Sequence, residues 1–145
     1  MQIVKNKKAY FDYFILDKYE AGISLLGSEV KSIRNGEVSI AESFISIEKN
    51  VQIKQMFINQ YTHSNTFKTV DPTRPRQLLL NKKEIERIKK KTQEKSITIV
   101  PLEIYENKQG KIKLLIAVVK GKKLYDKRHE LKEKTINLKK GEYNE

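Results

Sequence analysis

Apolar positions recur in short runs along this chain, and most of the runs have the two-residue period or the β-branched and aromatic content of strands. The pattern predicts about six strands, at residues 10–17, 19–26, 43–48, 51–58, 96–106 and 111–119. Residues 49–50 and 107–110 separate neighbouring runs as hairpin turns do, and residues 21–22 allow a bend or bulge. Residues 114–119 are apolar on both faces, so they should form the most buried strand.

Two segments between these runs carry the signals of helix starts and ends. Ser28 is a natural N-cap for a short helix that Gly36 can close in the left-handed conformation. Asn81 and Glu84 form a capping-box pattern at the start of a second helix, with Ile88 on its buried side. Strands in hairpins with helices inserted between them predict a mostly β, α+β fold. The specific expectation is a small, closed, antiparallel barrel of the oligonucleotide/oligosaccharide-binding type with two or three flanking helices.

The last part of the chain departs from this pattern. Residues 120–145 are helix-permissive but have few apolar positions, and short helices of this kind are marginal alone in water. We therefore expect two units, a β-barrel domain over residues 1–119 and a basic C-terminal tail over 120–145. The tail is predicted to be disordered when free and helical when bound.

Charge makes a polyanionic partner the leading hypothesis. The formal net charge is +12, and residues 120–140 hold nine Lys or Arg against three Asp or Glu, a local balance of 9 − 3 = +6. Arg74, Arg76 and residues 82–95 form a second basic region. A lysine-rich composition without a partner is the alternative, but clustered charge favours a binding surface.

Catalytic and metal-binding patterns are missing from the sequence. There are no cysteines, and the two histidines, His63 and His129, lack ligand spacing. No phosphate-binding glycine loop, nucleophile elbow or acidic cluster is present, so we expect neither an enzyme nor a metal or cofactor site. No run is apolar enough to span a bilayer, and the N-terminus has no secretory pattern, which favours the cytoplasm. Tyr125, inside the basic tail, could stack on bases or pack back on the barrel.

Five blocks of residues resemble one known family in the same order and spacing. They read NKKAYFDY at 6–13, EAGISLLGSEVKSIRNG at 20–36, DPTRPRQLLLNKKEI at 71–85, VPLEIY at 100–105 and KGKKLYDKR at 120–128. These blocks resemble the small protein B family, the SsrA-binding (tmRNA-binding) proteins of bacterial ribosome rescue. A ribosomal protein, another barrel-type translation factor and an RNA-processing enzyme are the alternatives.

The resemblance implies a non-enzymatic protein that binds the tRNA-like domain of transfer-messenger RNA and stands in for its missing anticodon arm. It implies that the tail enters the empty mRNA path near the decoding centre of the small ribosomal subunit and folds there. Elongation factor Tu and alanyl-tRNA synthetase would be partners indirectly, through the RNA. We expect the protein itself to be a cytoplasmic monomer.

Candidate site residues come from two sources. The resemblance places Asn6, Glu20, Leu79 and Asn81 on the RNA-binding face, and it places Lys122, Lys123, Tyr125, Asp126, Lys127 and Arg128 in the ribosome-binding part of the tail. Charge and position add Lys7, Lys8, Arg34, Arg74 and Arg76 as phosphate contacts. Asn81 also fits a helix cap and Leu79 also fits the core, so each has a structural alternative. Tyr125 stands where other members often carry His, and residues 141–145 are less basic than many family tails.

Overall fold

The fold is described from a computed structural model, which describes residues 2–60 and 71–121. Within these ranges the three helices are α1 (Lys7–Asp12), α2 (Gly27–Arg34) and α3 (Lys82–Lys91). The strands are β1 (Gln2–Lys5), β2 (Tyr13–Ile23), β3 (Val38–Ser39), β4 (Phe44–Ser46), β5 (Gln52–Lys54), β6 (Phe57–Ile58), β7 (Arg76–Leu79), β8 (Ile97–Glu106) and β9 (Ile112–Gly121). The predicted tail lies outside the described residues, except for Lys120 and Gly121, which belong to β9.

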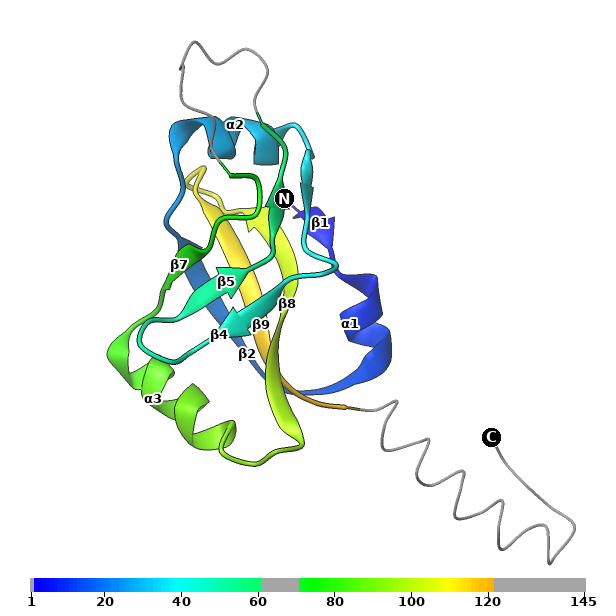
Figure 1. The fold of residues 1–145 in the computed structure, drawn as a ribbon, viewed down its shortest axis with the longest axis vertical. Helices are drawn as coiled ribbons and strands as arrows, with labels where there is room; N and C mark the ends of the chain where they lie inside the picture. Colours follow the sequence, from blue (N-terminus) through cyan, green and yellow to red (C-terminus); the bar gives the residue numbers. More distant parts are fainter. Residues whose placement is uncertain (1, 61–70, 122–145) are drawn as a thin grey trace, which may run out of the picture.

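Seven of these strands form one antiparallel sheet in the order β1-β8-β9-β2-β7-β5-β4, and β3 pairs with β6 in a separate ladder. The expected mostly β, α+β fold is confirmed, but the expected closed barrel is not found among the described residues. The sheet curls until β4 lies close to β8, and Figure 1 shows β4 and β5 crossing in front of β8 and β9. The ladder stays open because β4 crosses β8 without pairing with it, which leaves β1 and β4 as edges.

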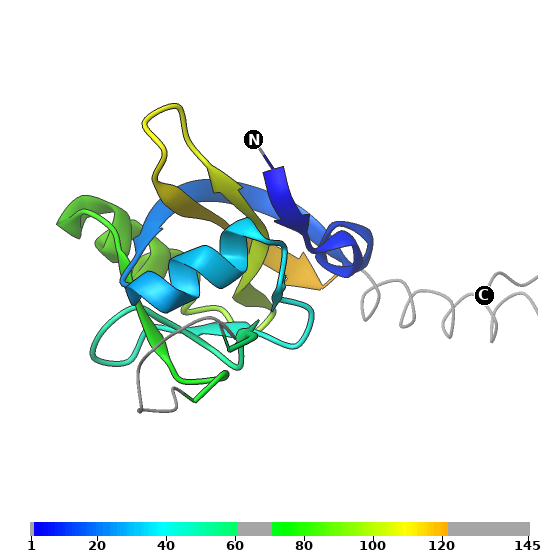
Figure 2. The same cartoon turned by 90° about the horizontal axis from the view of Figure 1, so that it is seen from above.

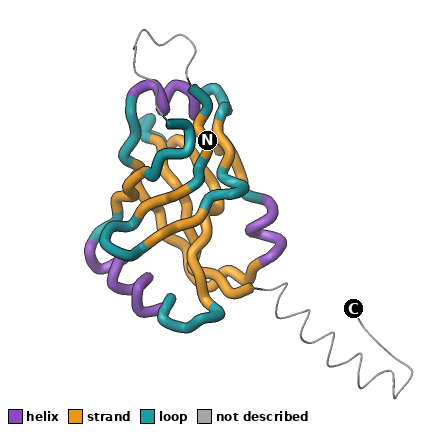
Figure 3. The backbone as a smooth tube through the Cα atoms, in the orientation of Figure 1, coloured by secondary structure: helices purple, strands orange, loops and turns teal. Residues whose placement is uncertain are grey.

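Helices lie at the periphery of this strand-rich body, as Figure 3 shows. Seen from above, α2 lies over one end of the curled sheet, with α1 and α3 on opposite sides (Figure 2). The inner face of the sheet carries the main core, to which α2 contributes Ile33 and α3 contributes Ile88, both 0% exposed. A smaller cluster under α1 joins Ala9 to Leu102, Ala117 and Val119 on the opposite, outer face.

Strand β9 is the most buried strand of the sheet, as its run of apolar residues predicts. Leu114 and Ile116 face the main core and Ala117 and Val119 face the cluster under α1, all with 0% exposure. It pairs with β2 on one side and β8 on the other over nearly its whole length. The β8–β9 hairpin is confirmed, and Gly110 closes its turn with a φ of +79°.

The predicted strand at residues 10–17 is wrong in its first part, because those residues continue a helix. Asn6 caps α1, its Oδ1 accepting a hydrogen bond from the backbone N–H of Ala9 at 3.2 Å. The chain then enters β2, which runs unbroken through both predicted strands. Its bulge lies between Ile15 and Asp17 and not at residues 21–22. A six-residue helix with aromatic side chains has the composition of a strand, and only its cap marks it as a helix.

The other predicted elements are largely confirmed. Asn81 and Glu84 form the expected capping box of α3, with the Glu84 N–H donating to Asn81 Oδ1 at 2.9 Å. Gly36 closes α2 with a φ of +77°, but the N-cap is Leu26 and not Ser28. The predicted hairpin at 43–58 exists as β4 and β5, and it ends early because Gln55 has a φ of +63°.

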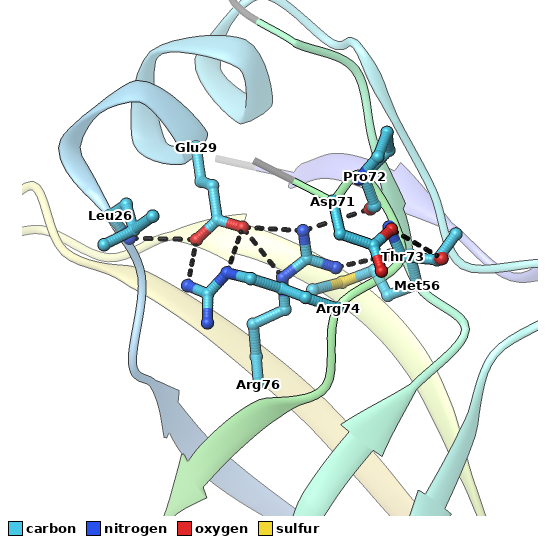
Figure 4. A network of polar contacts seen from close by, with 8 residues as sticks. All are labelled: Leu26, Glu29, Met56, Asp71, Pro72, Thr73, Arg74 and Arg76. Atoms are coloured by element: carbon cyan, nitrogen blue, oxygen red, sulfur yellow. Dashed lines mark hydrogen bonds and ion pairs between the residues drawn. The ribbon is translucent and has the colours of Figure 1, made fainter. Parts of the chain in front are cut away.

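A buried ion cluster joins α2 to the segment that enters β7 (Figure 4). The Glu29 carboxylate accepts hydrogen bonds from Arg74 Nη2 at 2.5 Å and from Arg76 Nη2 at 2.6 Å. Arg76 also donates to the backbone oxygens of Met56, at 2.5 Å, and Pro72, at 3.1 Å. The side chain of Arg76 is 0% exposed, so one guanidinium ties three chain segments together in the interior.

The same surroundings keep Glu29 charged. Burial alone would raise the pKa of this carboxyl group, but the hydrogen bonds from Arg74, from the Leu26 N–H and from Arg76 outweigh burial and lower it. Glu29 also bonds the N-cap of its own helix, since its Oε1 accepts from the Leu26 N–H at 2.9 Å. The carboxylate therefore stabilises the start of α2 and the position of β7 together.

Replacing Glu29 with Gln should destabilise the protein by about 3–5 kcal/mol, because it leaves the buried Arg76 charge without its partner. Chemical denaturation measures this loss. Glu106→Gln is the matched control: it removes the exposed pair between Arg34 and Glu106, which we expect to contribute only about 0–1 kcal/mol. Equal losses in the two variants would contradict the role given to Glu29.

Acid should erase the difference between the wild type and the Glu29→Gln variant. A carboxyl group whose pKa is lowered on folding contributes stability that is full above its ordinary value of 4.5 and is lost as the pH falls through the folded-state value. Free energies of unfolding measured from pH 7 down to about 3 should therefore converge in the acid range. A gap that stays constant with pH would show that Glu29 acts through packing alone.

Candidate nucleic-acid interface

Strand register gathers polar and aromatic side chains on the outer face of the sheet, beyond the part that α1 covers. Two rows cross the sheet there. The first row runs Leu79, Gly22, Lys113 and Tyr105 on β7, β2, β9 and β8, and the second runs Glu20, Leu115, Glu103 and Lys5 on β2, β9, β8 and β1. We call these eight residues the outer strip. It brings together apolar surface, two carboxylates, a phenol and two lysines on a single face.

Leu79 belongs to this surface and not to the core, so the structure excludes its core alternative. Its side chain is exposed (55%), while its neighbour Leu78 is buried on the inner face. Leu79 lies against Gly22, where an added Cβ would come within 3.2 Å of the Leu79 Cβ. The missing side chain at position 22 therefore leaves room for Leu79 beside the β2 backbone, two residues along from Glu20.

Two phenol–carboxylate pairs stand on the outer face. The Tyr105 hydroxyl donates a hydrogen bond to Glu20 Oε2, and the Tyr10 hydroxyl donates to Glu103 Oε2 at 2.5 Å. Burial, the hydrogen bond and the charge of Glu103 raise the pKa of Tyr10 to about 12, so its phenol stays a donor. Lys5 Nζ lies 4.7 Å from the centre of the Tyr10 ring.

Lysines frame these pairs with positive charge. Lys18 Nζ lies 5.8 Å from the Tyr10 ring on the side of β2, and Lys7 and Lys8 are exposed on α1. Ammonium groups at such positions neutralise phosphates, while carboxylates accept from ribose hydroxyls and base N–H groups. The outer face therefore carries both cations that can neutralise phosphates and carboxylates that can accept hydrogen bonds from RNA.

Several predicted contact residues have structural roles in this fold. Asn6 is 9% exposed, and its Nδ2 donates to the Pro101 carbonyl at 3.0 Å while its Oδ1 caps α1. Arg34 bonds Glu106 at 3.0 Å and the Gly110 carbonyl at 2.9 Å, which ties α2 to the β8–β9 turn. Arg76 is enclosed in the ion cluster, so its placement does not support a phosphate contact. Arg74 shares that cluster with a side chain 30% exposed.

Glu20 and Leu79 are thus the predicted residues that the fold brings together, and Asn81 follows β7 closely as the exposed cap of α3. The tail residues Lys122, Lys123, Tyr125, Asp126, Lys127 and Arg128 lie outside the described residues. Sequence reasoning missed Tyr10, Glu103, Tyr105 and Lys113. The alternation of Glu103 and Tyr105 placed them on one face of a strand. Nothing in the local sequence indicated that this strand, β8, lies two strands from β2, which carries Glu20.

Residues 2–60 and 71–121 contain no group of three or more His, Cys, Asp or Glu side chains placed to hold a metal ion. None of their helices is long and apolar enough to cross a bilayer.

With a curled antiparallel sheet whose outer face carries lysines, carboxylates and phenols, this is a small, basic, β-rich protein whose exposed surface is of the kind that suits nucleic acid. The family model described as SmpB protein matches residues 3–143. This chain therefore belongs to the SmpB protein family.

Individual relatives agree with this assignment. The SsrA-binding protein of Fervidobacterium nodosum is 48% identical over 142 residues, which cover 97% of this chain and 95% of the relative. The SsrA-binding protein of Thermosipho africanus is 49% identical with the same coverage. A solved structure described as "tmRNA-SmpB: a journey to the center of the bacterial ribosome" contains a chain that superposes with a TM-score of 0.70 at 42% identity. That match covers 92% of this chain and 93% of the other.

Substituting Asn81 by Ser should separate its capping role from an RNA contact. Ser is as good an N-cap as Asn, so α3 and the free energy of unfolding should change by less than about 0.5 kcal/mol. The amide N–H₂ donor is lost, so RNA affinity should fall about five- to tenfold if Asn81 bonds the RNA. Denaturation and filter binding on the same preparation give both values. Unchanged affinity would leave Asn81 as a cap alone.

Proposed function

We propose that this protein binds the tRNA-like domain of transfer-messenger RNA and, with that RNA, rescues stalled ribosomes by trans-translation. The observation that carries the proposal is the family match over residues 3–143, which includes the whole outer strip. The names of its relatives, SsrA-binding protein, and the solved tmRNA-SmpB structure support it. The curled sheet binds as an oligonucleotide/oligosaccharide-binding barrel does, by presenting one face of its strands to the RNA.

In this proposal, different residues of the outer strip and its surroundings contact different groups of the RNA. Lys7, Lys8 and the outer-face lysines neutralise backbone phosphates, which makes affinity salt-dependent. Glu20 accepts a hydrogen bond from the RNA and Leu79 gives an apolar contact to an exposed base. Arg34 and Arg74 keep partly exposed guanidinium groups that can add phosphate contacts at the α2 end.

The basic tail supplies the second surface in this proposal. Beyond Lys120 and Gly121, which belong to β9, residues 122–145 form an arm that is disordered when free and becomes helical in the empty mRNA path near the decoding centre. Lys122 and Lys123 meet backbone phosphates there, and the segment from Tyr125 to Arg128 opens the helix. An arm and an mRNA that compete for the same path would let the ribosome detect a missing message.

The remaining elements of the proposal follow from this role. The protein acts as a cytoplasmic monomer and has no catalytic activity of its own. Elongation factor Tu and alanyl-tRNA synthetase meet it through the RNA, the first during delivery and the second during charging with alanine.

Capture of RNA from cells tests the proposal directly. Pull-down of the intact protein followed by sequencing should recover one tRNA-like species far above ribosomal RNA. Recovery of ribosomal RNA alone would favour a ribosomal protein instead. Incubation with labelled tRNA-like RNA should leave the RNA unchanged, and metal-dependent cleavage or modification would replace the proposal with an RNA-processing enzyme.

Ending the chain after Gly121 should separate the two proposed surfaces. This cut keeps all of β9, which pairs with β2 through Gly121, so the sheet should remain folded. Affinity for the tRNA-like domain should stay within about threefold of wild type, and tagging on stalled ribosomes should be abolished. Gel-shift and in vitro tagging assays measure the two properties. A collapse of affinity would place the tail in the primary RNA site.

A further inference from the structure

The Glu20–Tyr105 pair is unusual in its reach. Glu20 lies on β2 and Tyr105 on β8, with β9 between them. Their cross-strand partners on β9 are Leu115 and Lys113, which are two residues apart on the same face. Two strand spacings separate the β2 and β8 backbones by roughly 9–10 Å, so the Tyr105 side chain must extend across β9 for its hydroxyl to reach Glu20 Oε2.

This hydrogen bond contributes little that the sheet needs. Glu20 is exposed, and bonds between exposed side chains add little stability. The same stretch of β2 is already held by a continuous antiparallel ladder to β9, from Asp17 to Gly22. A bond that adds so little to stability, yet fixes a rotamer-rich carboxylate, acts mainly on the direction in which that carboxylate points.

The direction matters because only one Glu20 oxygen is engaged. The phenol donates to Oε2, and among the described residues Oε1 accepts no hydrogen bond. Burial, the bond to Glu20 and the charge of Glu103 raise the pKa of Tyr105, so the hydroxyl remains protonated and remains the donor. Tyr105 thus holds Glu20 with one occupied oxygen and one available acceptor.

An exposed carboxylate on this face is electrostatically unfavourable beside phosphates. The surrounding lysines partly offset this repulsion. Lys113 faces the same side from β9, and Lys18 lies two residues before Glu20 on β2. A carboxylate in such a place can gain only from a hydrogen-bond donor of the RNA, which is a ribose 2′-hydroxyl or the N–H of a base edge.

We infer that Tyr105 is a positioning residue of the RNA site, which orients the Glu20 carboxylate as a single acceptor for a hydrogen-bond donor of the RNA. This inference rests on the proposed function. The RNA donor is either a ribose 2′-hydroxyl or a base N–H.

A double-mutant cycle on binding of the isolated tRNA-like domain tests this role. Tyr105→Phe should weaken binding about five- to tenfold, and Glu20→Ala should weaken it about ten- to a hundredfold. The double variant should bind no worse than Glu20→Ala alone, because Tyr105 acts only through Glu20. Wild-type affinity in Tyr105→Phe, or a further equal loss in the double variant, would overturn the inference.

Tyr19→Phe is the matched control. The Tyr19 hydroxyl also donates a hydrogen bond to a carboxylate, Asp17 Oδ2 at 2.7 Å, but Tyr19 is buried on the inner face of β2. Its loss removes the same chemical group without touching the RNA face, so affinity should stay within about twofold of wild type. Weakening equal to that of Tyr105→Phe would show a general effect of stability and would contradict the positioning role.

RNA variants identify the donor. One panel of tRNA-like domains carries single 2′-deoxy substitutions, and a second replaces single bases by analogues that each lack one N–H donor, such as inosine, which lacks the N2 amino group of guanosine. One substitution in one panel should weaken binding to the wild type about fivefold and leave Glu20→Ala unaffected. If none does, the acceptor role is wrong. If wild-type protein shows no preference for the tRNA-like domain over unrelated RNA of equal length, the proposed function fails instead.

Discussion

The arrangement of this protein depends most on the ion pairs that the Glu29 carboxylate forms with Arg74 and Arg76. One carboxylate binds two arginines from the segment that enters β7 and also the first turn of its own helix. Arg76 extends the connection to the carbonyls of Met56 and Pro72. Taking these charges out of water is costly, and complete pairing is what makes it tolerable. Strand β7 then carries Leu79 to the outer face beside β2.

This cluster also explains why a basic sequence is a poor guide to a basic surface. Arg74 and Arg76 belong to a basic stretch of the sequence, yet the fold uses one carboxylate to hold both. Arg34 is likewise engaged with the β8–β9 turn. The lysines of α1 and of the outer face keep their charges outward, because a long flexible ammonium side chain is seldom fixed in the interior. The side chains available to phosphates are thus mostly lysines.

Local patterns were enough to predict the parts of the fold that depend on local chemistry. The capping box at Asn81, the left-handed closure at Gly36 and the buried run of β9 all follow from neighbouring residues. Pairing across the sheet was not predictable, since the contact between Glu20 and Tyr105 depends on β9 lying between their strands. The same limit applied to Arg76, whose burial depends on a carboxylate 47 positions away in the chain. Resemblance to a family pointed to Glu20 and Leu79, but it did not reveal their neighbours.

The long β2–β9 ladder fixes a distance within the molecule. Tyr13 pairs with Gly121 at one end, where the chain leaves the sheet, and Glu20 pairs with Leu115 toward the other. The six steps from Leu115 to Gly121 correspond to roughly 20 Å of extended chain. A strand buried on both faces and paired on both sides bends little, so the ladder works as a rigid spacer between the outer strip and the root of the C-terminal segment. The distance from the outer strip to the end of β9 is thereby set by strand length.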